Sequence, residues 1–178
     1  AQKFGRDEDF VNAKLGTTTL SVKADHEETS DLAVKAVERL LDNNAQLKRE
    51  DIQALIVVTQ NGDAEQLPHT SAIVQHKLGL PTTAACFDVS LGCSGYVYGL
   101  YVAKGFMQAT GLKNAVLVTA DPYSKIMDRE DRMTTLLFGD AATATWMTSD
   151  QPQWLLGASA FGGDGGGDEY LVVRDGHF

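Results

Sequence analysis

The chain comprises 178 residues with a formal net charge of −9, and 43% of its residues are hydrophobic and 22% charged. This length suits one domain with its own core, and no apolar run approaches the roughly 20 residues that span a bilayer. The acidic balance argues against non-specific binding to nucleic acid, which requires a basic face, so neither a nucleic acid nor a membrane is an expected partner.

The N-terminal part of the chain predicts an edge strand, a helix and a buried strand. Residues 17–22 are rich in threonine, which favours a short edge strand. Thr29 or Ser30 is a candidate cap for a helix, because apolar residues recur at helical spacing over residues 32–41. Residues 52–59 form an apolar run rich in β-branched side chains, which is typical of a strand buried on both faces in a parallel sheet.

The middle of the chain alternates between helix and strand. Residues 70–78 predict a helix closed by Gly79, and residues 96–109 predict a longer helix. Apolar runs at residues 84–89 and 115–120 predict two further buried strands. This alternation predicts a layered α/β fold with a largely parallel sheet.

The C-terminal part of the chain is less regular. Residues 128–133 are charged and favour a helical turn, and residues 136–147 are apolar and rich in small side chains. Residues 154–161 predict a further strand, and a glycine-rich loop follows at residues 162–167. Because the sequence shows no internal repeat and no linker, residues 1–178 are expected to form one domain.

The two cysteines occupy different positions in this pattern. Cys86 lies inside a predicted strand and is interpreted as structural, whereas Cys93 follows that strand and begins the next helix. A helix N-terminus favours the thiolate and lowers the pKa of a thiol placed there. Gly92 and Gly95 allow the backbone to turn sharply beside it. The arrangement favours Cys93 as a nucleophile for thioester exchange, with its own N–H available to an oxyanion hole.

A structural interpretation of Cys93 stays open at this point, because cysteine is among the most buried residue types. The spacing of Cys86 and Cys93 matches no metal motif, so no metal is expected. Two cysteines in apolar surroundings favour reduced thiols in a cytoplasmic protein, and the polar residues 1–9 do not resemble a signal peptide.

Several segments in the correct order resemble one enzyme family. Residues 88–100 (DVSLGCSGYVYGL) resemble the nucleophile segment of β-ketoacyl-ACP synthase III, in the thiolase-like superfamily. Residues 128–144 (DREDRMTTLLFGDAATA) are similar to the family's Asp-Arg … Phe-Gly-Asp-Gly/Ala-Ala segment. Residues 115–121 and 67–80 resemble the strand between these motifs and the helix before the nucleophile strand. The resemblance implies one half of a thiolase-like α/β fold, with a mixed, largely parallel sheet covered by helices.

The resemblance implies roles for four residues. Cys93 would be acylated by an acyl-CoA primer. Arg132 matches the family arginine that stacks near the CoA nucleotide, with a solvated surface charge as the alternative. Phe138 would line the acyl pocket or belong to an apolar core. Leu67 stands where the family often has an aromatic residue that reaches across the dimer into the partner's acyl pocket, and its smaller side chain leaves room for a primer longer or bulkier than acetyl.

The family's mechanism also requires a His and an Asn, which lie in the family's C-terminal half. None of the four histidines of this chain stands in the family's motif: His26, His69, His76 and His177. Two of them, His69 and His76, are expected on the surface of one helix. Gly139 and Asp140 are interpreted as a tight turn and its hydrogen bonding. The chain is therefore expected to be an N-terminal half, either a piece of a longer enzyme, a partner of a separate chain, or a natural stand-alone domain.

Together these observations favour an acyltransferase that condenses an acyl-CoA primer with malonyl-ACP through a Cys93 acyl-enzyme and initiates fatty-acid synthesis. No metal or redox cofactor is implied, and the resemblance implies a homodimer formed around residues 67–89. A polyketide- or quinolone-type condensing enzyme and a primer transacylase stay open, as does a non-catalytic partner or scaffold subunit. The 178 residues alone are expected to be inactive or limited to self-acylation.

Overall fold

The computed structural model describes residues 2–5 and 7–173, and its contacts group them into two compact units. The larger unit comprises residues 24–121 and 141–157 and contains the sheet. The smaller unit takes its described residues from three segments: the part before residue 24, residues 122–140 and residues 158–173. We describe each unit separately, and the expectation of one domain over the whole chain stays a prediction.

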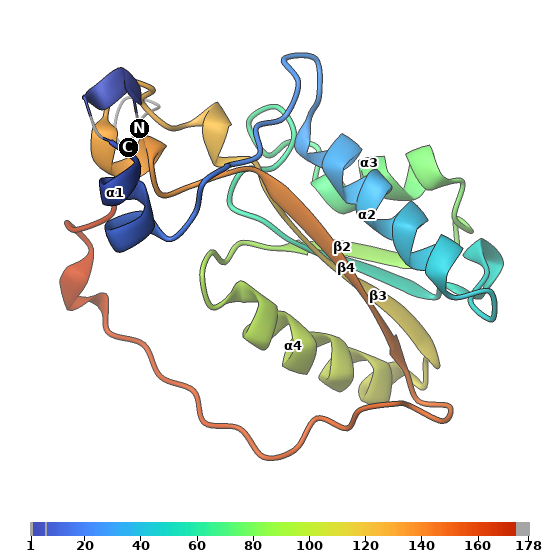
Figure 1. Cartoon of the computed structure of the whole chain (residues 1–178). Coiled ribbons are helices and arrows are strands. Elements are labelled where there is room, and N and C mark those ends of the chain that lie inside the picture. The colour runs from blue at the N-terminus through green and yellow to red at the C-terminus, as the bar shows by residue number, and fades with distance from the viewer. Residues whose placement is uncertain (1, 6, 174–178) are drawn as a thin grey trace. The chain divides into compact units, whose positions relative to one another are not determined.

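Four strands form the sheet of the larger unit, in the order β2-β1-β3-β4 (Figure 1). Their bounds are Ala54–Val58 for β1, Ala85–Val89 for β2, Asn114–Asp121 for β3 and Ala141–Thr148 for β4. The central strand β1 runs parallel to both β2 and β3, and β4 closes the sheet antiparallel to β3. The predicted mixed, largely parallel sheet is therefore confirmed.

The central strand β1 is buried along its whole length, as its apolar run predicts. Its side chains alternate between the two faces of the sheet: Leu55 and Val57 pack into one core cluster, and Ile56 and Val58 pack into another. Each buried side chain of this size stabilises the fold by about 1.5–3 kcal/mol. Strand β2, in contrast, is only half-buried because it lies at the edge of the sheet, so the prediction of a fully buried strand at residues 84–89 was wrong.

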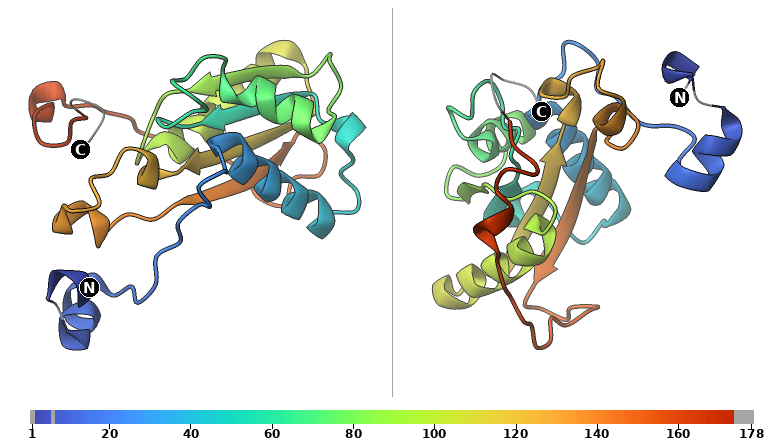
Figure 2. Two further views of the ribbon diagram at one scale, coloured as in Figure 1. Left: turned by 90° about the horizontal axis from the view of Figure 1, so that it is seen from above. Right: turned by 90° about the vertical axis from the view of Figure 1, so that its left-hand side faces the viewer.

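Helices cover both faces of the sheet (Figures 1 and 2). Helices α2 (Thr29–Asn43) and α3 (Thr70–Leu78) lie on one face, and α4 (Gly95–Thr110) lies on the other. Helix α3 has the predicted bounds, and Gly79 ends it with a left-handed φ of 63°. The predicted cap of α2 was wrong by one or two positions, because Glu28 occupies the cap and its N–H donates to the Asp31 carboxylate over 2.8 Å.

Helix α4 approaches the sheet closely through its glycines. A Cβ at Gly95 would lie 2.5 Å from Cγ1 of Val58, and a Cβ at Gly99 would lie 2.9 Å from Cδ1 of Leu117. Any larger residue would therefore push the helix away from β1 and β3. The two glycines bring the start of α4, and with it the turn that holds Cys93, against the centre of the sheet.

The smaller unit consists of short helical segments and contains a buried carboxylate, that of Asp140. Its elements are η1 (Gln2–Phe4), α1 (Glu8–Phe10), η2 (Val11–Leu15), η4 (Tyr123–Lys125), α5 (Arg132–Thr135) and η5 (Gly165–Gly167). The Asp140 carboxylate is 5% exposed and accepts hydrogen bonds from the backbone N–H groups of Lys23 and Ser124, at 2.7 and 2.9 Å. A Cβ at Gly139 would lie 3.1 Å from the carbonyl oxygen of Ser21. The hydrogen bonding predicted for Asp140 is confirmed, whereas the tight turn predicted at Gly139 was wrong, because Gly139 instead lies in an irregular segment against the backbone of Ser21.

Two predicted strands are absent, for a shared physical reason. The backbone of residues 17–22 pairs with no strand, and the carbonyl of Ser21 instead accepts the Asp140 N–H over 2.8 Å. Residues 154–161 are likewise not a strand. The carbonyl oxygens of Leu156 and Gly157 accept hydrogen bonds from Lys104 and Tyr101 of α4, at 3.0 Å each. In both segments, hydrogen bonds from residues distant in sequence take the place of pairing with a neighbouring strand. The local sequence does not predict these hydrogen bonds.

No helix within residues 2–5 and 7–173 is long and apolar enough to cross a membrane.

Candidate active site

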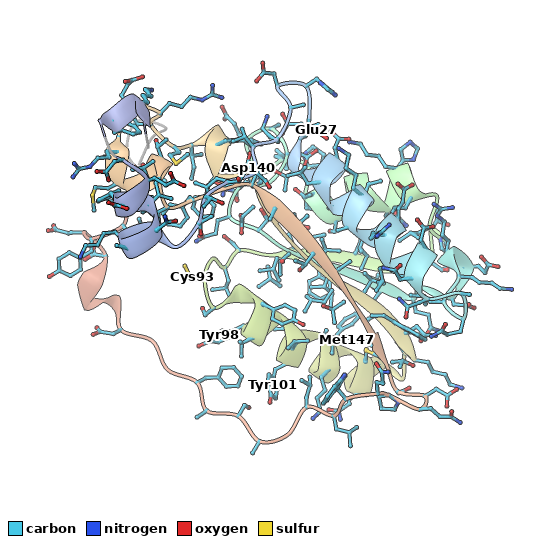
Figure 3. All side chains as sticks on the ribbon, in the orientation of Figure 1. Glu27, Cys93, Tyr98, Tyr101, Asp140 and Met147 are labelled. Atoms are coloured by element: carbon cyan, nitrogen blue, oxygen red, sulfur yellow. The ribbon has the colours of Figure 1, made fainter. Side chains whose placement is uncertain are left out.

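Cys93 lies in the turn between β2 and α4, and its side chain is exposed (Figure 3). The N–H of Gly95 donates to the carbonyl of Gly92 over 2.7 Å and closes this turn around the cysteine. Ser94 then occupies the cap position of α4. The order of strand, tight turn, exposed thiol and helix is the one predicted, and it leaves the sulfur accessible to a thioester substrate.

Two long-range contacts fix the end of β2 before this turn. The N–H of Thr59 donates to the carbonyl of Val89 over 3.1 Å. The carboxylate of Asp88 accepts the N–H groups of Thr70 and Ser71, at 2.6 and 2.8 Å, and so caps α3. The strand that leads to Cys93 is thereby joined to both β1 and α3.

Sequence analysis missed this role of Asp88. The signal that could have indicated it lies at the start of α3, where the cap position is occupied by His69 and no local side chain caps the helix. A helix that begins without a Ser, Thr, Asp or Asn at its cap requires an acceptor from elsewhere in the fold.

Cys86 is the contrasting thiol. It lies in β2, half-buried, with its Sγ 3.5 Å from the carbonyl oxygen of Ala84. Burial raises the pKa of the Cys86 thiol above its usual value, and the nearby carboxylate of Asp88 raises it further. The structural interpretation of Cys86 therefore fits its surroundings, and Cys93 is the more accessible of the two thiols.

Leu67 lies in the loop between β1 and α3 and is 83% exposed. A leucine side chain this exposed buries little apolar surface against its own chain. Leu67 and Cys93 both belong to the larger unit. The pocket role predicted for Leu67 stays a prediction.

Arg132 and Phe138 belong to the smaller unit and are described within it. Arg132 is the first residue of α5, whose N-terminus is capped by Asp131 through the N–H groups of Met133 and Thr134. The ring of Phe138 stacks on that of Tyr123, with centroids 4.8 Å apart. The substrate contacts predicted for Arg132 and Phe138 stay predictions, and the alternative apolar packing of Phe138 has a partner in Tyr123.

The histidines of the described chain lie at the surface. His26, His69 and His76 are exposed, as predicted for the last two, and His177 lies outside the described residues. Over residues 2–5 and 7–173, no group of three or more His, Cys, Asp or Glu side chains is arranged to hold a metal ion.

Comparison with known proteins gives consistent matches. Residues 87–165 match the family model described as 3-oxoacyl-[acyl-carrier-protein (ACP)] synthase III. A relative from Neisseria gonorrhoeae named β-ketoacyl-[acyl-carrier-protein] synthase III is 39% identical over 153 residues, which cover 85% of this chain and 47% of the relative. Over most of its length the chain is similar to one half of the β-ketoacyl-ACP synthase III enzymes. The family match contains Cys93, Arg132 and Phe138, whereas Leu67 precedes it.

Solved structures of synthase III enzymes share the fold. A 2.1 Å crystal structure of a 3-oxoacyl-ACP synthase III superposes with a TM-score of 0.84 and 37% identity, over 91% of this chain and 48% of that one. The synthase III of Thermus thermophilus gives a TM-score of 0.81 and 34% identity, over 94% and 51% of the two chains. The predicted thiolase-like fold is confirmed. The chain spans about half the length of the curated synthase III relatives that it matches.

Proposed function

We propose that the protein containing this chain is a β-ketoacyl-ACP synthase III-type acyltransferase that initiates fatty-acid synthesis. The observation that carries this proposal is the exposed thiol of Cys93 in the turn between β2 and α4, within the segment that matches the family model. A buried or strand-embedded cysteine, like Cys86, would not support it.

The proposed first step transfers the acyl group of an acyl-CoA primer to Cys93. The thiolate sulfur attacks the thioester carbonyl carbon, the bond from that carbon to the sulfur of CoA breaks, and CoA leaves and takes up a proton. Both sides of the exchange are thioesters, so the step needs no oxidant or metal. We assign the backbone N–H of Cys93 as one donor to the developing oxyanion.

The proposed second step consumes malonyl-ACP. Its malonyl group loses CO2, the resulting enolate carbon attacks the acyl carbonyl on Cys93, and the bond to the cysteine sulfur breaks. β-Ketoacyl-ACP leaves and the thiolate is regenerated. We assign the His and Asn that promote decarboxylation in this family to the part of the protein outside these 178 residues, because no described histidine lies in the family motif.

We further propose a homodimer that uses the edge of the sheet. Strand β2 pairs with β1 on one side and forms the sheet edge on the other. An edge strand presents unpaired N–H and C=O groups, which a second copy of the strand can pair with across a twofold axis. Light scattering of the whole protein should give twice the mass of one chain, and a monomer at micromolar concentration would contradict this proposal.

A cytoplasmic location also belongs to this proposal, because both cysteines are free in the structure and stable disulfides mark oxidising compartments.

The acyl-enzyme is tested by intact-mass spectrometry after incubation with a panel of acyl-CoAs from acetyl to octanoyl. The protein should gain one acyl group, Cys93→Ser should abolish this gain, and Cys86→Ser should leave it unchanged. The preferred primer separates fatty-acid initiation from a polyketide- or quinolone-type role. A protein that neither gains an acyl group nor reacts with iodoacetamide at Cys93 would instead be a scaffold subunit, and the proposal would be wrong.

A further inference from the structure

The loop between β1 and α3, residues 60–69, has an unusual backbone beside Leu67. Ala64 and Gln66 have positive φ angles of 48° and 69°. Residues other than glycine adopt this left-handed region rarely, and they keep it only where the surrounding structure holds them there. Both positions are exposed, and the side-chain amide of Gln66 donates to the carbonyl of Gln60 across the loop over 3.1 Å.

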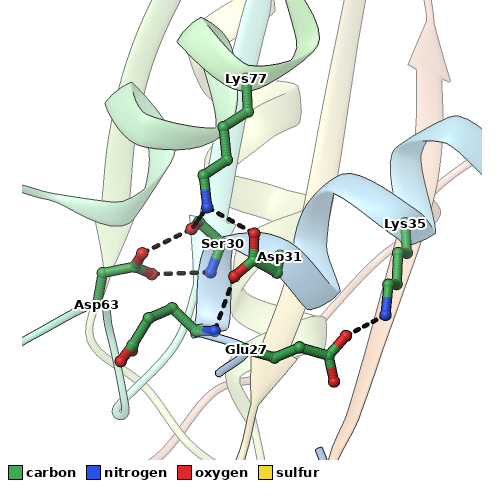
Figure 4. A network of polar contacts seen from close by, with 7 residues as sticks. Glu27, Ser30, Asp31, Lys35, Asp63 and Lys77 are labelled. Carbon is green, nitrogen blue, oxygen red and sulfur yellow. Dashed lines mark hydrogen bonds and ion pairs between the residues drawn. The ribbon is translucent and has the colours of Figure 1, made fainter. Parts of the chain in front are cut away.

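Asp63 supplies the central contact of this loop (Figure 4). It is 6% exposed, and its carboxylate accepts the N–H of Ser30 over 2.7 Å and the hydroxyl of Ser30 over 2.6 Å. Ser30 is fully buried in the first turn of α2. A buried carboxylate that accepts two hydrogen bonds from one residue fixes both distance and orientation.

Four further hydrogen bonds extend from this pair. Lys77 of α3 donates to the hydroxyl of Ser30 over 2.8 Å and to the carboxylate of Asp31 over 2.6 Å. The backbone of Asp63 donates its N–H to the hydroxyl of Thr70 over 3.0 Å and accepts the N–H of Gln66 over 2.9 Å. Asp63 therefore joins α2 and α3 and also closes the turn that leads to Leu67.

The two ends of the loop are fixed by other carboxylates. At its start, Oδ1 of Asp121 accepts the N–H of Gln60 over 2.9 Å and the side-chain amide of Asn61 over 3.1 Å. At its end, Asp88 caps α3. Between these ends, Asp63 supplies the buried contact of the turn, and the bond from Gln66 to Gln60 supplies an exposed one.

We propose that Asp63 is a positioning residue for primer selection: through Ser30 and the turn to Gln66, it holds Leu67 in the one place from which Leu67 limits the length of the acyl primer. This inference rests on the proposed function and on the acyl-pocket role that the family resemblance implies for Leu67. It adds a determinant of specificity that lies in a buried polar network and not in the pocket itself.

The test compares primer selectivity in the whole protein. In Asp63→Asn, the amide cannot accept from both donor groups of Ser30, so the turn loosens. The ratio of kcat/KM for acetyl-CoA to kcat/KM for octanoyl-CoA should shift by about threefold to tenfold, toward the ratio of Leu67→Ala. In the Leu67→Ala background, Asp63→Asn should leave the ratio unchanged, because the side chain that it positions is absent.

Two further variants keep the test decisive. Ser30→Ala removes the hydrogen bond from the hydroxyl to Asp63 and keeps the bond from the backbone N–H. A smaller shift of the kcat/KM ratio in the same direction is expected. If Asp63→Asn does not fold, Ser30→Ala alone tests the inference. Val37→Ala truncates a fully buried side chain elsewhere in α2 and should lower stability without changing the ratio.

An unchanged ratio in a folded, active Asp63→Asn or Ser30→Ala variant would overturn the inference, as would a shift that persists in the Leu67→Ala background. Absence of acylation of the unmodified protein by every primer would overturn the proposed function and this inference together.

Discussion

Buried or half-buried carboxylates bind the backbone of segments that are distant in sequence. Asp63 binds the N-terminus of α2, Asp88 binds the N-terminus of α3, and Asp121 binds the loop after β1. Asp140 performs the same function within the smaller unit. Each carboxylate accepts N–H groups that have no partner in a helix or strand, so loss of any one leaves backbone donors unsatisfied.

At the residue scale, Asp31 should give the fold a measurable pH dependence. The N–H of Glu28 and the ammonium group of Lys77 hold the pKa of Asp31 below its ordinary value. Because this pKa is lower in the folded state, the ionised carboxylate stabilises the fold above the unfolded-state value of about 4, and this stabilisation is lost as the pH falls through the folded-state pKa.

Asp31→Asn should therefore lower the free energy of unfolding at pH 7 by about 0.5–1 kcal/mol, and the difference should be smaller at about pH 3. Urea unfolding at the two pH values measures it. Burial raises the pKa of Asp121, so the contribution of Asp121 to stability falls as the pH rises. This contribution is the same in both proteins and cancels from the difference in unfolding free energy. Asp42→Asn, at an exposed position of the same helix, should cost no stability. A difference at about pH 3 as large as the difference at pH 7 would contradict the account.

At the element scale, the contact of α4 with β1 makes Gly95 the position least tolerant of a side chain. The Cβ of Gly95→Ala would lie 2.5 Å from Cγ1 of Val58, inside any real contact distance. We expect a loss of about 1–3 kcal/mol in unfolding free energy and slower acylation of Cys93, because the start of α4 must move.

Gly105→Ala is the matched control in the same helix, since a Cβ there meets nothing within 4 Å. It should stabilise the protein by about 0.5–1 kcal/mol. Equal effects of the two substitutions, measured by thermal unfolding, would show that α4 does not lie against β1 as described.

Elements were predictable from the sequence where local rules decide them. Helix α3 follows from its apolar spacing and Gly79, and β1 follows from its buried run. The strands predicted at residues 17–22 and 154–161 are absent because hydrogen bonds with Asp140 and with α4 hold the backbone there.

The position of Cys93 was predictable because the strand, the turn and the helix around it adjoin in sequence. Asp63 and Asp88 were not, since their partners lie 33 and 17–18 residues away.

At the scale of the whole molecule, α4 exposes three large apolar side chains. Tyr96, Val97 and Val102 are 43%, 52% and 38% exposed in this chain. Exposed apolar side chains of this size are typical of a surface that another part of a protein covers. We expect these side chains to be covered in the protein that contains this chain.

Val97→Glu should then destabilise the whole protein by about 2 kcal/mol or more, because it buries an unpaired carboxylate. Ala45→Glu, in the exposed loop after α2, should change stability by less than about 0.5 kcal/mol. Equal melting temperatures for the two variants would show that Val97 stays in solvent.

The most direct test of the central claim is condensation by the whole protein. Supplied with an acyl-CoA primer and malonyl-ACP, it should release CO2 and form β-ketoacyl-ACP, and Cys93→Ser should slow this turnover by about a thousandfold or more while the protein stays folded. Formation of product by Cys93→Ser at the unmodified rate, or no product from the unmodified protein with any primer, would contradict the assignment of Cys93 as the acyl-accepting nucleophile.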